Sequence, residues 1–361
     1  MIYRVIGVMS GSSLDGLDIA YIHFEEQSGK WQFEIMEAEC RTYNEDWVKK
    51  LRHATDLNAR DHALLDADLG HYIGQEVVAF MKEKQLDYRV ALISSHGHTS
   101  FHIPPRVTVQ LGQGSAIAAE TGLPVVSDLR AVDVALGGQG APIVPMGERM
   151  LWKDVPLFLN IGGIANISAN MGAHYLAYDV CPANRVLNML AAKVGKEYDE
   201  GGRLAASGTV NDKLLNELNG LDYYSKPFPK SLANDFGTDQ VFPMLEKGGS
   251  ELRDLLRTYV EHIALQVARA VEHHAHDLGN APHMMVTGGG AFNDFLIERI
   301  RQLLEPMRVQ VDLPDEKIIK FKEALIMGLL GVLRWRDEPT ALASVTGARR
   351  DSVGGALWGR M

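Results

Sequence analysis

The stretch that decides the fold is RVIGVMSGSSLDGLDIA, residues 4–20. Its apolar run at 5–8 predicts a β-strand, and a second strand is predicted to begin at Leu17. The small residues between them let backbone N–H groups approach an oxyanion, and the serine hydroxyls add donors. Asp15 can hold a hydrated Mg²⁺ beside that anion. We therefore predict a phosphate-binding turn inside a β-hairpin, made of Gly11, Ser12, Ser13, Asp15 and Gly16. The alternative is an ordinary hairpin turn, which uses the same residue types.

The same pattern returns at residues 157–170, LFLNIGGIANISAN, as strand, small-residue turn and strand. A third strand and then a helical segment are predicted after each hairpin. The distance between the two copies is too long for a solenoid and fits a duplicated domain. We therefore expect two lobes that face each other over a nucleotide, at residues 1–152 and 153–340. The tail, 341–361, is expected to pack back on the first lobe.

Composition narrows the class of protein. With 361 residues, 46% of them hydrophobic and 23% charged, the chain is typical of a globular protein with two domains. The net charge of −10 argues against nucleic acid or an anionic membrane as the main partner, although one site can still attract an anion. Cys40 and Cys181 fit neither a disulfide framework nor a zinc site. The sequence shows no leader and no span of bilayer length, so we expect the cytoplasm.

Two segments between the hairpins carry polar residues that suit a sugar. Asp128, Arg130 and Asp133 precede a glycine-rich loop, where carboxylates and a guanidinium can recognise hydroxyls. Pairing and capping within the loop is the equally weighted alternative. His96 belongs to SHGHT, residues 95–99, where substrate contact or loop packing is favoured over metal binding. A partial dinucleotide fingerprint, GQGSAI at 112–117, has isoleucine in place of its third glycine and is a weak signal.

The second half of the chain contains a candidate general base and a glycine-rich segment that can lie against a ligand. Asp179 ends the third strand of the second copy, where a carboxylate is well placed as a general base. The alternative is a cap for the helix that follows, although Asn184 can provide that cap itself. The GGGAFN segment at 288–293 follows a predicted strand, and its glycines let the backbone lie flat against a planar or anionic ligand. Long helices are predicted at 252–278 and 323–335, and the histidines at 273, 274 and 276 are expected on a solvated face.

Taken together, these motifs resemble the anhydro-N-acetylmuramic acid kinase family of the actin, hexokinase and Hsp70-type ATPase superfamily. The resemblance runs nearly end to end, and several motifs in the right order make it specific. Its strongest stretches are GVMSGSSLDGLD (7–18), SHGHT (95–99), DVALGGQGAPIVP (133–145), NIGGIANIS (160–168), PKS (229–231), TGGGAFN (287–293) and VTGA (345–348).

The resemblance implies a two-lobed, actin-like (ribonuclease H-like) α/β fold, with a mixed sheet and flanking helices in each lobe. It identifies Asp179 with the family's catalytic base and Glu323 with an active-site glutamate. It assigns the residues around 96 and 128–133 to the sugar side. The nucleotide side comprises the first turn, the second turn with Gly162, Gly163 and Asn166, and the adenosine wall with Gly288, Gly289, Gly290 and Asn293.

The activity implied is ATP- and Mg²⁺-dependent. The 1,6-anhydro bridge would be hydrolysed and O6 phosphorylated, giving N-acetylmuramic acid 6-phosphate for cell-wall sugar recycling, and a homodimer is expected. Four places depart from the family pattern, all on the acceptor side: DVCPAN (179–184), HGHT (96–99), LAND (232–235), and Ala131 with Val132, where the family usually has basic residues. A kinase for another anhydro sugar or a plain hexosamine therefore stays open. A non-enzymatic ATP-binding actin-like protein and a dinucleotide oxidoreductase are further alternatives.

Overall fold

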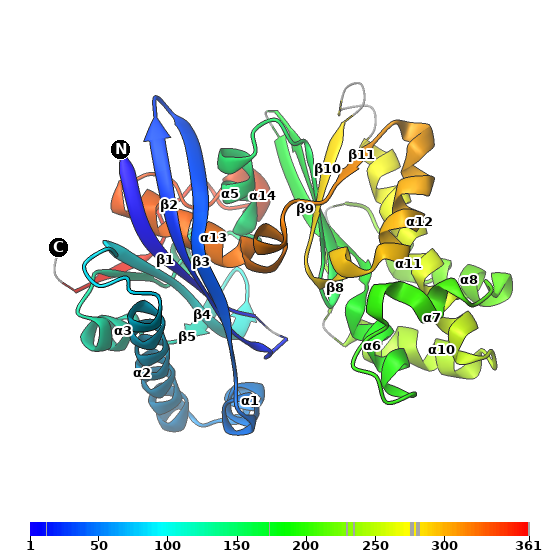
Figure 1. The fold of residues 1–361 in the computed structure, drawn as a ribbon, viewed down its shortest axis with the longest axis horizontal. Coiled ribbons are helices and arrows are strands. Elements are labelled where there is room, and N and C mark those ends of the chain that lie inside the picture. The colour runs from blue at the N-terminus through cyan, green and yellow to red at the C-terminus, as the bar shows by residue number, and fades with distance from the viewer. Residues whose placement is uncertain are drawn as a thin grey trace. The chain divides into compact units, whose positions relative to one another are not determined.

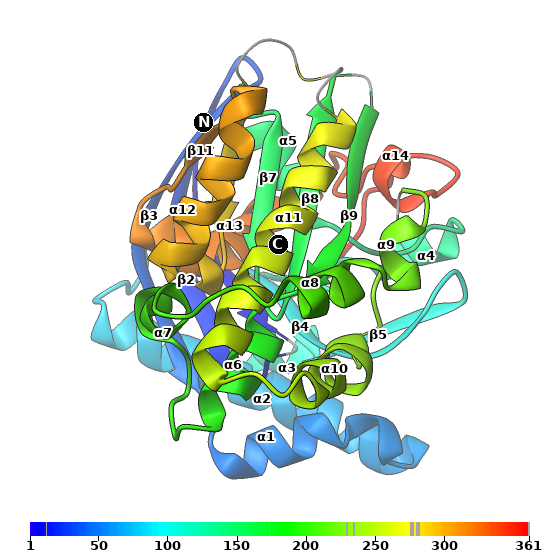
Figure 2. The same cartoon turned by 90° about the vertical axis from the view of Figure 1, so that its right-hand side faces the viewer.

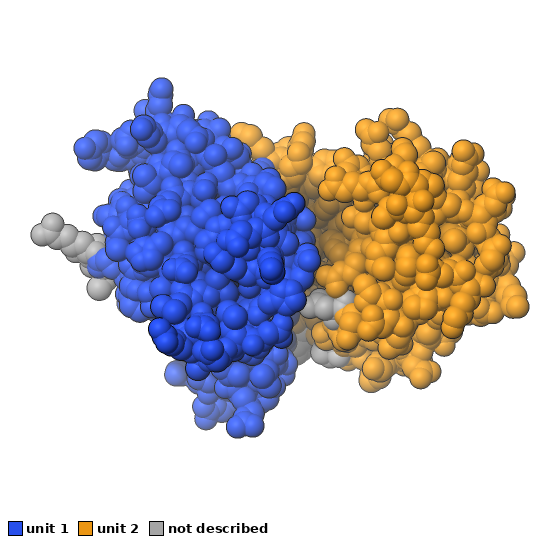
Figure 3. Space-filling model, turned by 90° about the horizontal axis from the view of Figure 1, so that it is seen from below, with its two compact units in different colours: residues 1–153, 321–361 blue, residues 154–320 orange. Residues whose placement is uncertain are grey.

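The computed structural model describes residues 1–11, 13–172, 174–228, 230–233, 235–274, 278 and 282–359. The chain forms two compact units, one of residues 1–153 with 321–361 and one of residues 154–320 (Figures 1 and 3). The expected lobes differ from these units at 321–340, which belong to unit 1. Gly7 of the first strand explains the difference, because a side chain there would overlap the carbonyl oxygen of Ala324. The helix after residue 320 thus packs on the sheet of unit 1.

Unit 1 is built on a seven-stranded mixed sheet (Figure 1). β1 and β2 form the first hairpin, β3 extends it antiparallel, and β4 lies parallel to β1 on its other side. The strand order is β12-β6-β4-β1-β2-β3, with β5 paired to β4. The strands are β1 (Ile2–Ser10), β2 (Gly16–Gln27), β3 (Lys30–Thr42), β4 (Leu92–Ile103), β5 (Val107–Leu111), β6 (Val125–Ser127) and β12 (Ala356–Trp358).

Alternation along β1 sends its side chains to two helix layers. Ile6 and Val8 face α2 and α3 in one apolar core, whereas Gly7 faces α13. The tail returns to this unit, where β12 pairs with β6. The helices of unit 1 are α1 (Glu45–Arg52), α2 (Ala59–Glu83), α3 (Gly114–Thr121), α4 (Ala131–Ala135), α5 (Val144–Leu151), α14 (Ala343–Thr346) and most of α13 (Glu316–Trp335).

Unit 2 repeats the central part of that sheet. Its order, β11-β10-β7-β8-β9, corresponds to β6-β4-β1-β2-β3 of unit 1, with the same parallel and antiparallel pairings. The expected fold class is confirmed: each unit is a mixed sheet with flanking helices, and the β-hairpin is duplicated. The strands are β7 (Leu157–Ile161), β8 (Ile164–Met171), β9 (His174–Pro182), β10 (His283–Thr287) and β11 (Gln310–Asp312).

The core of unit 2 lies between this sheet and α11, which crosses β7 and β8 in Figure 2. Tyr259 of α11 is fully buried and donates its hydroxyl to the carbonyl of Pro182, 2.7 Å away. The helices are α6 (Asn184–Ala192), α7 (Arg203–Ala206), α8 (Asp212–Asn219), α9 (Asp222–Ser225), α10 (Phe242–Lys247), α11 (Leu252–His274) and α12 (Asp294–Leu304), with a 3₁₀ turn at Gly289–Phe292.

Several local predictions need correction. β4 continues through SHGHT to Ile103, with β5 paired to it antiparallel from His98 on, whereas the sequence favoured substrate contact or loop packing for SHGHT. α13 begins at Glu316, before a non-helical residue at Phe321, rather than at 323. His274 is buried against the Tyr178 hydroxyl, 2.9 Å from its Nε2, so it does not lie on a solvated face; His276 lies outside the described residues.

Candidate functional site

The turn of the first hairpin leaves room over its backbone. A Cβ at Gly11 would meet only the Oγ of Ser13, at 3.5 Å, which is ordinary contact. Gly16 is different, because a Cβ there would lie 2.5 Å from the carbonyl oxygen of Arg41 on β3. Gly16 is thus required by strand pairing, while Gly11 and the exposed Ser13 are open to a ligand. Ser12, also expected here, lies outside the described residues.

Buried polar contacts hold the end of β1 next to that turn. The Tyr43 hydroxyl donates to Ser10 Oγ at 2.8 Å, and Ser10 Oγ lies 3.2 Å from His98 Nδ1. Burial lowers the pKa of His98 to about 4, so this ring is neutral at physiological pH. The position of the turn is therefore fixed by groups that carry no charge there.

Three acidic side chains of unit 1 interact near this turn. Burial, with smaller contributions from the charges of Glu323 and Asp15, raises the pKa of Asp18 to about 6, against a hydrogen bond with the Cys40 thiol. Asp15 itself is exposed. Within the described part of the chain, no group of three or more His, Cys, Asp or Glu side chains could enclose a metal. Mg²⁺ characteristically keeps several waters and takes one or two carboxylates together with phosphate, and Asp15 with Asp18 fits that requirement.

Asp18 was not singled out from the sequence. Its signal is an acidic residue in the otherwise apolar first part of β2, residues 16–22, two residues into the strand that follows the turn. An acid kept half-buried at such a position, with a raised pKa, is typical of a functional site.

The raised pKa makes a prediction about stability. Ionising Asp18 is less favourable in the folded protein than in the unfolded chain. The contribution of this side chain to the unfolding free energy is therefore fully present below about pH 4, and it is lost as pH rises through about 6. Asp18→Asn should therefore increase the unfolding free energy of unit 1 at pH 8 by about 2 kcal/mol, and change it little at pH 4. Urea unfolding at the two pH values measures this. An Asn variant that is less stable than the wild type at pH 8 would contradict it.

Among the buried side-chain nitrogens of unit 1 that have no hydrogen-bond partner among the described residues are Arg130 Nε and His96 Nε2. His96 Nδ1–H donates to the Gly97 carbonyl at 2.8 Å, which leaves Nε2 as an acceptor. Burial lowers the pKa of His96 to about 3, with the charge of Arg130 acting the same way, so the ring stays neutral. Because buried polar atoms are rarely left unpaired, His96 Nε2 suits a ligand hydroxyl that donates, and Arg130 Nε–H suits a hydroxyl or an anionic group.

Glu323 lies on α13 among charged neighbours. Burial raises its pKa, whereas Lys322 and Arg130 lower it. Burial lowers the pKa of Arg130 to about 10, against the charge of Glu323. The neighbouring Lys322 Nζ donates to Glu148 Oε1 of α5 at 3.0 Å, and both side chains are almost completely buried. The Lys322–Glu148 ion pair holds the part of α13 that follows Phe321 against α5, with the charge of Arg130 close to Glu323.

The two aspartates of that loop have different surroundings. Asp133 is buried and accepts hydrogen bonds from the Thr346 hydroxyl at 2.7 Å and from the Gly140 N–H at 2.8 Å. Its carboxylate therefore ties the glycine-rich loop to the VTGA segment. Asp128 is exposed in a left-handed backbone conformation, with φ of 57°, and partial burial raises its pKa with help from Asp66. Asp128 is thus the more accessible of the two.

The second hairpin turn, in unit 2, is also open over its glycines. A Cβ at Gly162 would meet nothing closer than 3.5 Å, and one at Gly163 nothing closer than 3.8 Å. The carbonyls of both glycines accept backbone hydrogen bonds from the start of α6, with Asn184 N–H donating to Gly162 at 3.0 Å. Asn166 is half-buried on β8, in register with Asn160 of β7. Backbone hydrogen bonds thus join the turn to the N-terminus of α6.

The GGGAFN segment divides into glycines that packing requires and one that it does not. Gly288 has φ of 81°, and its Cβ would lie 2.7 Å from the carbonyl oxygen of Ile161. A side chain at Gly290 would overlap that of Ile161. Gly289 would meet only Asn184 Nδ2, at 3.4 Å. Asn293 caps α12, because its Oδ1 accepts from Leu296 N–H at 3.0 Å.

Asp179 is held by the segment that follows Lys230. Its Oδ2 accepts from Leu232 N–H at 2.9 Å and from the Ser231 hydroxyl at 3.2 Å. Burial raises the pKa of Asp179, while these two hydrogen bonds lower it. Its side chain does not cap α6, and neither does that of Asn184, which donates to the Ile161 carbonyl instead. Among the described residues, Oδ1 accepts no hydrogen bond, so this oxygen is available to a water or a substrate.

Comparison with known proteins decides the family. A family model described as anhydro-N-acetylmuramic acid kinase matches residues 3–360. The chain belongs to this family. Similar relatives are the anhydro-N-acetylmuramic acid kinases of Vibrio vulnificus, 32% identical over 98% of each chain, and of Coxiella burnetii, 32% identical over 99% of this chain and 98% of the relative. The expected family is thereby confirmed, and so is the expectation of an enzyme that is a phosphotransferase.

Among solved structures, the activator of 2-hydroxyisocaproyl-CoA dehydratase from Clostridium difficile aligns over 92% of this chain and 96% of its own, with a TM-score of 0.45 and 13% identity. A hexokinase of the ROK type from Thermus thermophilus aligns over 91% and 99%, with a TM-score of 0.40 and 12% identity.

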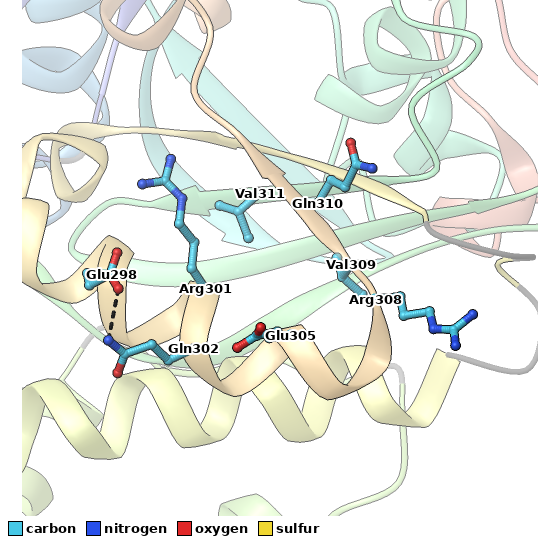
Figure 4. Close-up of a pocket in the computed structure, with 8 residues that line it drawn as sticks. All are labelled: Glu298, Arg301, Gln302, Glu305, Arg308, Val309, Gln310 and Val311. Carbon is cyan, nitrogen blue, oxygen red and sulfur yellow. Dashed lines mark hydrogen bonds between the residues drawn. The ribbon is translucent and has the colours of Figure 1, made fainter.

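Two further observations concern parts of the protein outside the candidate site. A hollow beside α12 and β11 is lined by Glu298, Arg301, Gln302, Glu305 and residues 308–311, and Figure 4 shows the hydrogen bond from Gln302 to Glu298. It contains none of the predicted site residues. Of the helices in the described ranges, none combines the length and apolar character needed to span a bilayer.

Proposed function

We propose that this chain opens the 1,6-anhydro bridge of anhydro-N-acetylmuramic acid and phosphorylates O6 with ATP, giving N-acetylmuramic acid 6-phosphate. Family membership supports the substrate class. The single observation that carries the hydrolytic step is Asp179, whose Oδ2 is held by two donors while Oδ1 has no partner among the described residues. The proposal includes a cytoplasmic place in cell-wall sugar recycling and a homodimer, which sedimentation of the purified protein tests.

In the first step, Asp179 accepts a proton from a water that attacks C1 of the sugar. The new C1–O bond forms as the C1–O6 bond breaks, and O6 leaves with the electron pair of that bond. A positioned base contributes about 10²–10⁴-fold to such a step. The raised pKa of Asp179 is compatible with this role, because it brings the carboxylate closer to the pH at which it works.

In the second step, O6 attacks the γ-phosphorus of ATP, and the bond to the bridging oxygen of ADP breaks. The open backbone at Gly11 and Ser13 in unit 1, and at Gly162 and Gly163 in unit 2, suits donation of N–H groups to phosphate oxygens. Asp15 and Asp18 would hold a hydrated Mg²⁺, which neutralises charge on the transferred phosphoryl group when bound.

The sugar is recognised in unit 1 by polar groups that include two nitrogens with no hydrogen-bond partner among the described residues. His96 Nε2 accepts a hydrogen bond from a hydroxyl, and the Arg130 guanidinium donates to an oxygen of the sugar. Asp128 supplies an accessible acceptor, and Glu323 keeps Arg130 charged and oriented. Asp133 acts through the loop that it organises.

A kinase for another anhydro sugar or for a plain hexosamine is the second candidate, because Cys181 and Ala183 lie beside the base in DVCPAN, which departs from the family pattern that the sequence resembles. Incubation of the protein with ATP and a panel of anhydro and open-chain amino sugars, followed by ³¹P NMR, distinguishes them. The proposal expects a 6-phosphate only, or fastest, from anhydro-N-acetylmuramic acid. ATP binding with no sugar-dependent turnover would instead indicate the non-enzymatic alternative.

Gly289 provides a prediction about the nucleotide. Because a Cβ at this position lies no closer than 3.4 Å to the atoms around it, we expect Gly289→Val to fold normally. If backbone at this position lies against ATP, the added side chain should weaken ATP binding about tenfold or more, while sugar binding changes little. Titration calorimetry with each ligand measures both. Ala206→Val, at an exposed position of α7 in the same unit, is the control, and an unchanged ATP affinity would remove Gly289 from the site.

A further inference from the structure

We propose that Lys230 is a positioning residue for Asp179: its ammonium group fixes the segment 230–232 that supplies both donors to the Asp179 carboxylate. This inference rests on the proposed role of Asp179 as the base. It adds a residue that touches neither the substrate nor the carboxylate and acts through the backbone.

The ammonium group of Lys230 is held on several sides at once. Its Nζ donates to the carbonyls of Tyr223 and Tyr224, at 3.1 and 3.4 Å. The same nitrogen lies over three aromatic rings, 4.6 Å from the centroid of Tyr223, 4.8 Å from that of Phe228 and 5.9 Å from that of Tyr224. Both kinds of contact require a cation or a strong donor. Burial lowers the pKa of Lys230, as does Lys226, so the fold accepts a desolvation cost to keep a lysine there.

The backbone links this cage to Asp179 directly. The carbonyl of Lys230 accepts from Asp179 N–H at 3.1 Å, and the next two residues donate to Asp179 Oδ2. Tyr223 closes the link, since its ring lies under Lys230 and its hydroxyl donates to the Asp179 carbonyl at 2.6 Å. Asp179 is thus fixed at its N–H, its carbonyl and its carboxylate by residues that contact Lys230 or follow it.

The position of the segment determines the charge state of the base. The donors on Oδ2 stabilise the ionised carboxylate and oppose the effect of burial. Cys181 and Tyr223 also face this region, but burial raises the pKa of both far above neutrality, and neither carries charge at working pH. If the segment loosens, Asp179 loses its donors and binds its proton more tightly. The acid limb of the pH profile then moves to higher pH.

The test is the pH profile of kcat for the anhydro sugar. Lys230→Met keeps the apolar stem and removes the ammonium group, and it should shift the acid limb upward by about one pH unit, with ATP affinity unchanged. Lys230→Arg keeps a cation and donors and should stay close to the wild type. Lys226→Met is the matched control, because Lys226 is exposed and lies 5.8 Å from the Tyr223 ring without contributing to the segment. Its profile should coincide with that of the wild type.

A double-mutant cycle separates positioning from a through-space effect of the lost charge. Ser231→Ala alone should shift the acid limb of the pH profile upward by about half a pH unit. Adding Ser231→Ala to Lys230→Met should shift it little further, because the loss of the Lys230 ammonium group has already displaced the Ser231 hydroxyl. Additive shifts, or a Lys230→Met profile that matches the wild type, would overturn the proposal. If Lys230→Met does not fold, a Ser231→Ala limb at the wild-type pH overturns it instead. Asp179→Asn is run in parallel: full activity in that variant refutes the base itself, a different failure.

Discussion

Replacing Asp179 by Asn is expected to lower kcat for the anhydro sugar by about 10²-fold or more, with ATP affinity nearly unchanged. An amide keeps the shape of the carboxylate, and its oxygen can still accept from Leu232 N–H and the Ser231 hydroxyl. It then presents its NH₂ group where Oδ1 stood, and this group cannot take a proton from water. The helix that follows is unaffected, because Asp179 does not cap it.

Steady-state kinetics with saturating ATP, together with calorimetric titration of ATP, measures this effect. Asp222→Asn is a matched control, since Asp222 is an exposed aspartate at the start of α9 in the same unit. It should retain wild-type kcat. If Asp179→Asn turns over as fast as the wild type, water activation by this residue is wrong, and the chain is better described as a plain sugar kinase.

The second large effect concerns stability. Lys322→Met should destabilise unit 1 by about 3–5 kcal/mol, because Glu148 would keep its buried charge while losing the cation 3.0 Å away. Replacing both partners, as in Lys322→Met with Glu148→Leu, should recover most of that loss. The double variant therefore distinguishes the loss of this ion pair from a simple loss of packing.

Chemical denaturation at pH 7 measures both variants. Lys320→Met is the control on the same helix, since Lys320 pairs with Glu316 on the surface and should cost at most about 0.5 kcal/mol. If the Lys322 and Lys320 variants are equally stable, the buried pair does not contribute as described.

The hairpins were predictable from sequence because they are local. An apolar run, a few small residues and a second apolar run can fold in few ways, and the same pattern occurs twice in the chain. SHGHT was not predicted as part of β4 because it is polar; it pairs with β1 at Ser95 and His98 and with β5 at His98 and Thr99. α13 was assigned to the wrong side of the domain boundary for a similar reason. Its packing partner, Gly7, lies in the first strand of the chain.

The candidate site, too, could be predicted from the sequence only in part. Glycine-rich turns and Asp179 stand out as sequence patterns. Sequence patterns do not show that Gly288 and Gly290 are needed for packing against Ile161 while Gly289 is not. Nor do they show that the Asp133 carboxylate accepts a hydrogen bond from Thr346, or that Lys230 fixes the segment that holds Asp179. Each of these depends on contacts between residues far apart in the chain, and such contacts exist only in the folded protein.

The central claim is that one enzyme joins hydrolysis of the anhydro bridge to phosphorylation of O6. Turnover of the anhydro sugar in ¹⁸O-labelled water, quenched early to limit exchange at the anomeric carbon, tests it most directly. Mass spectrometry of the product should find one ¹⁸O on C1 and none in the phosphate. Product that carries no label on C1, or carries it in the phosphate, would contradict the claim.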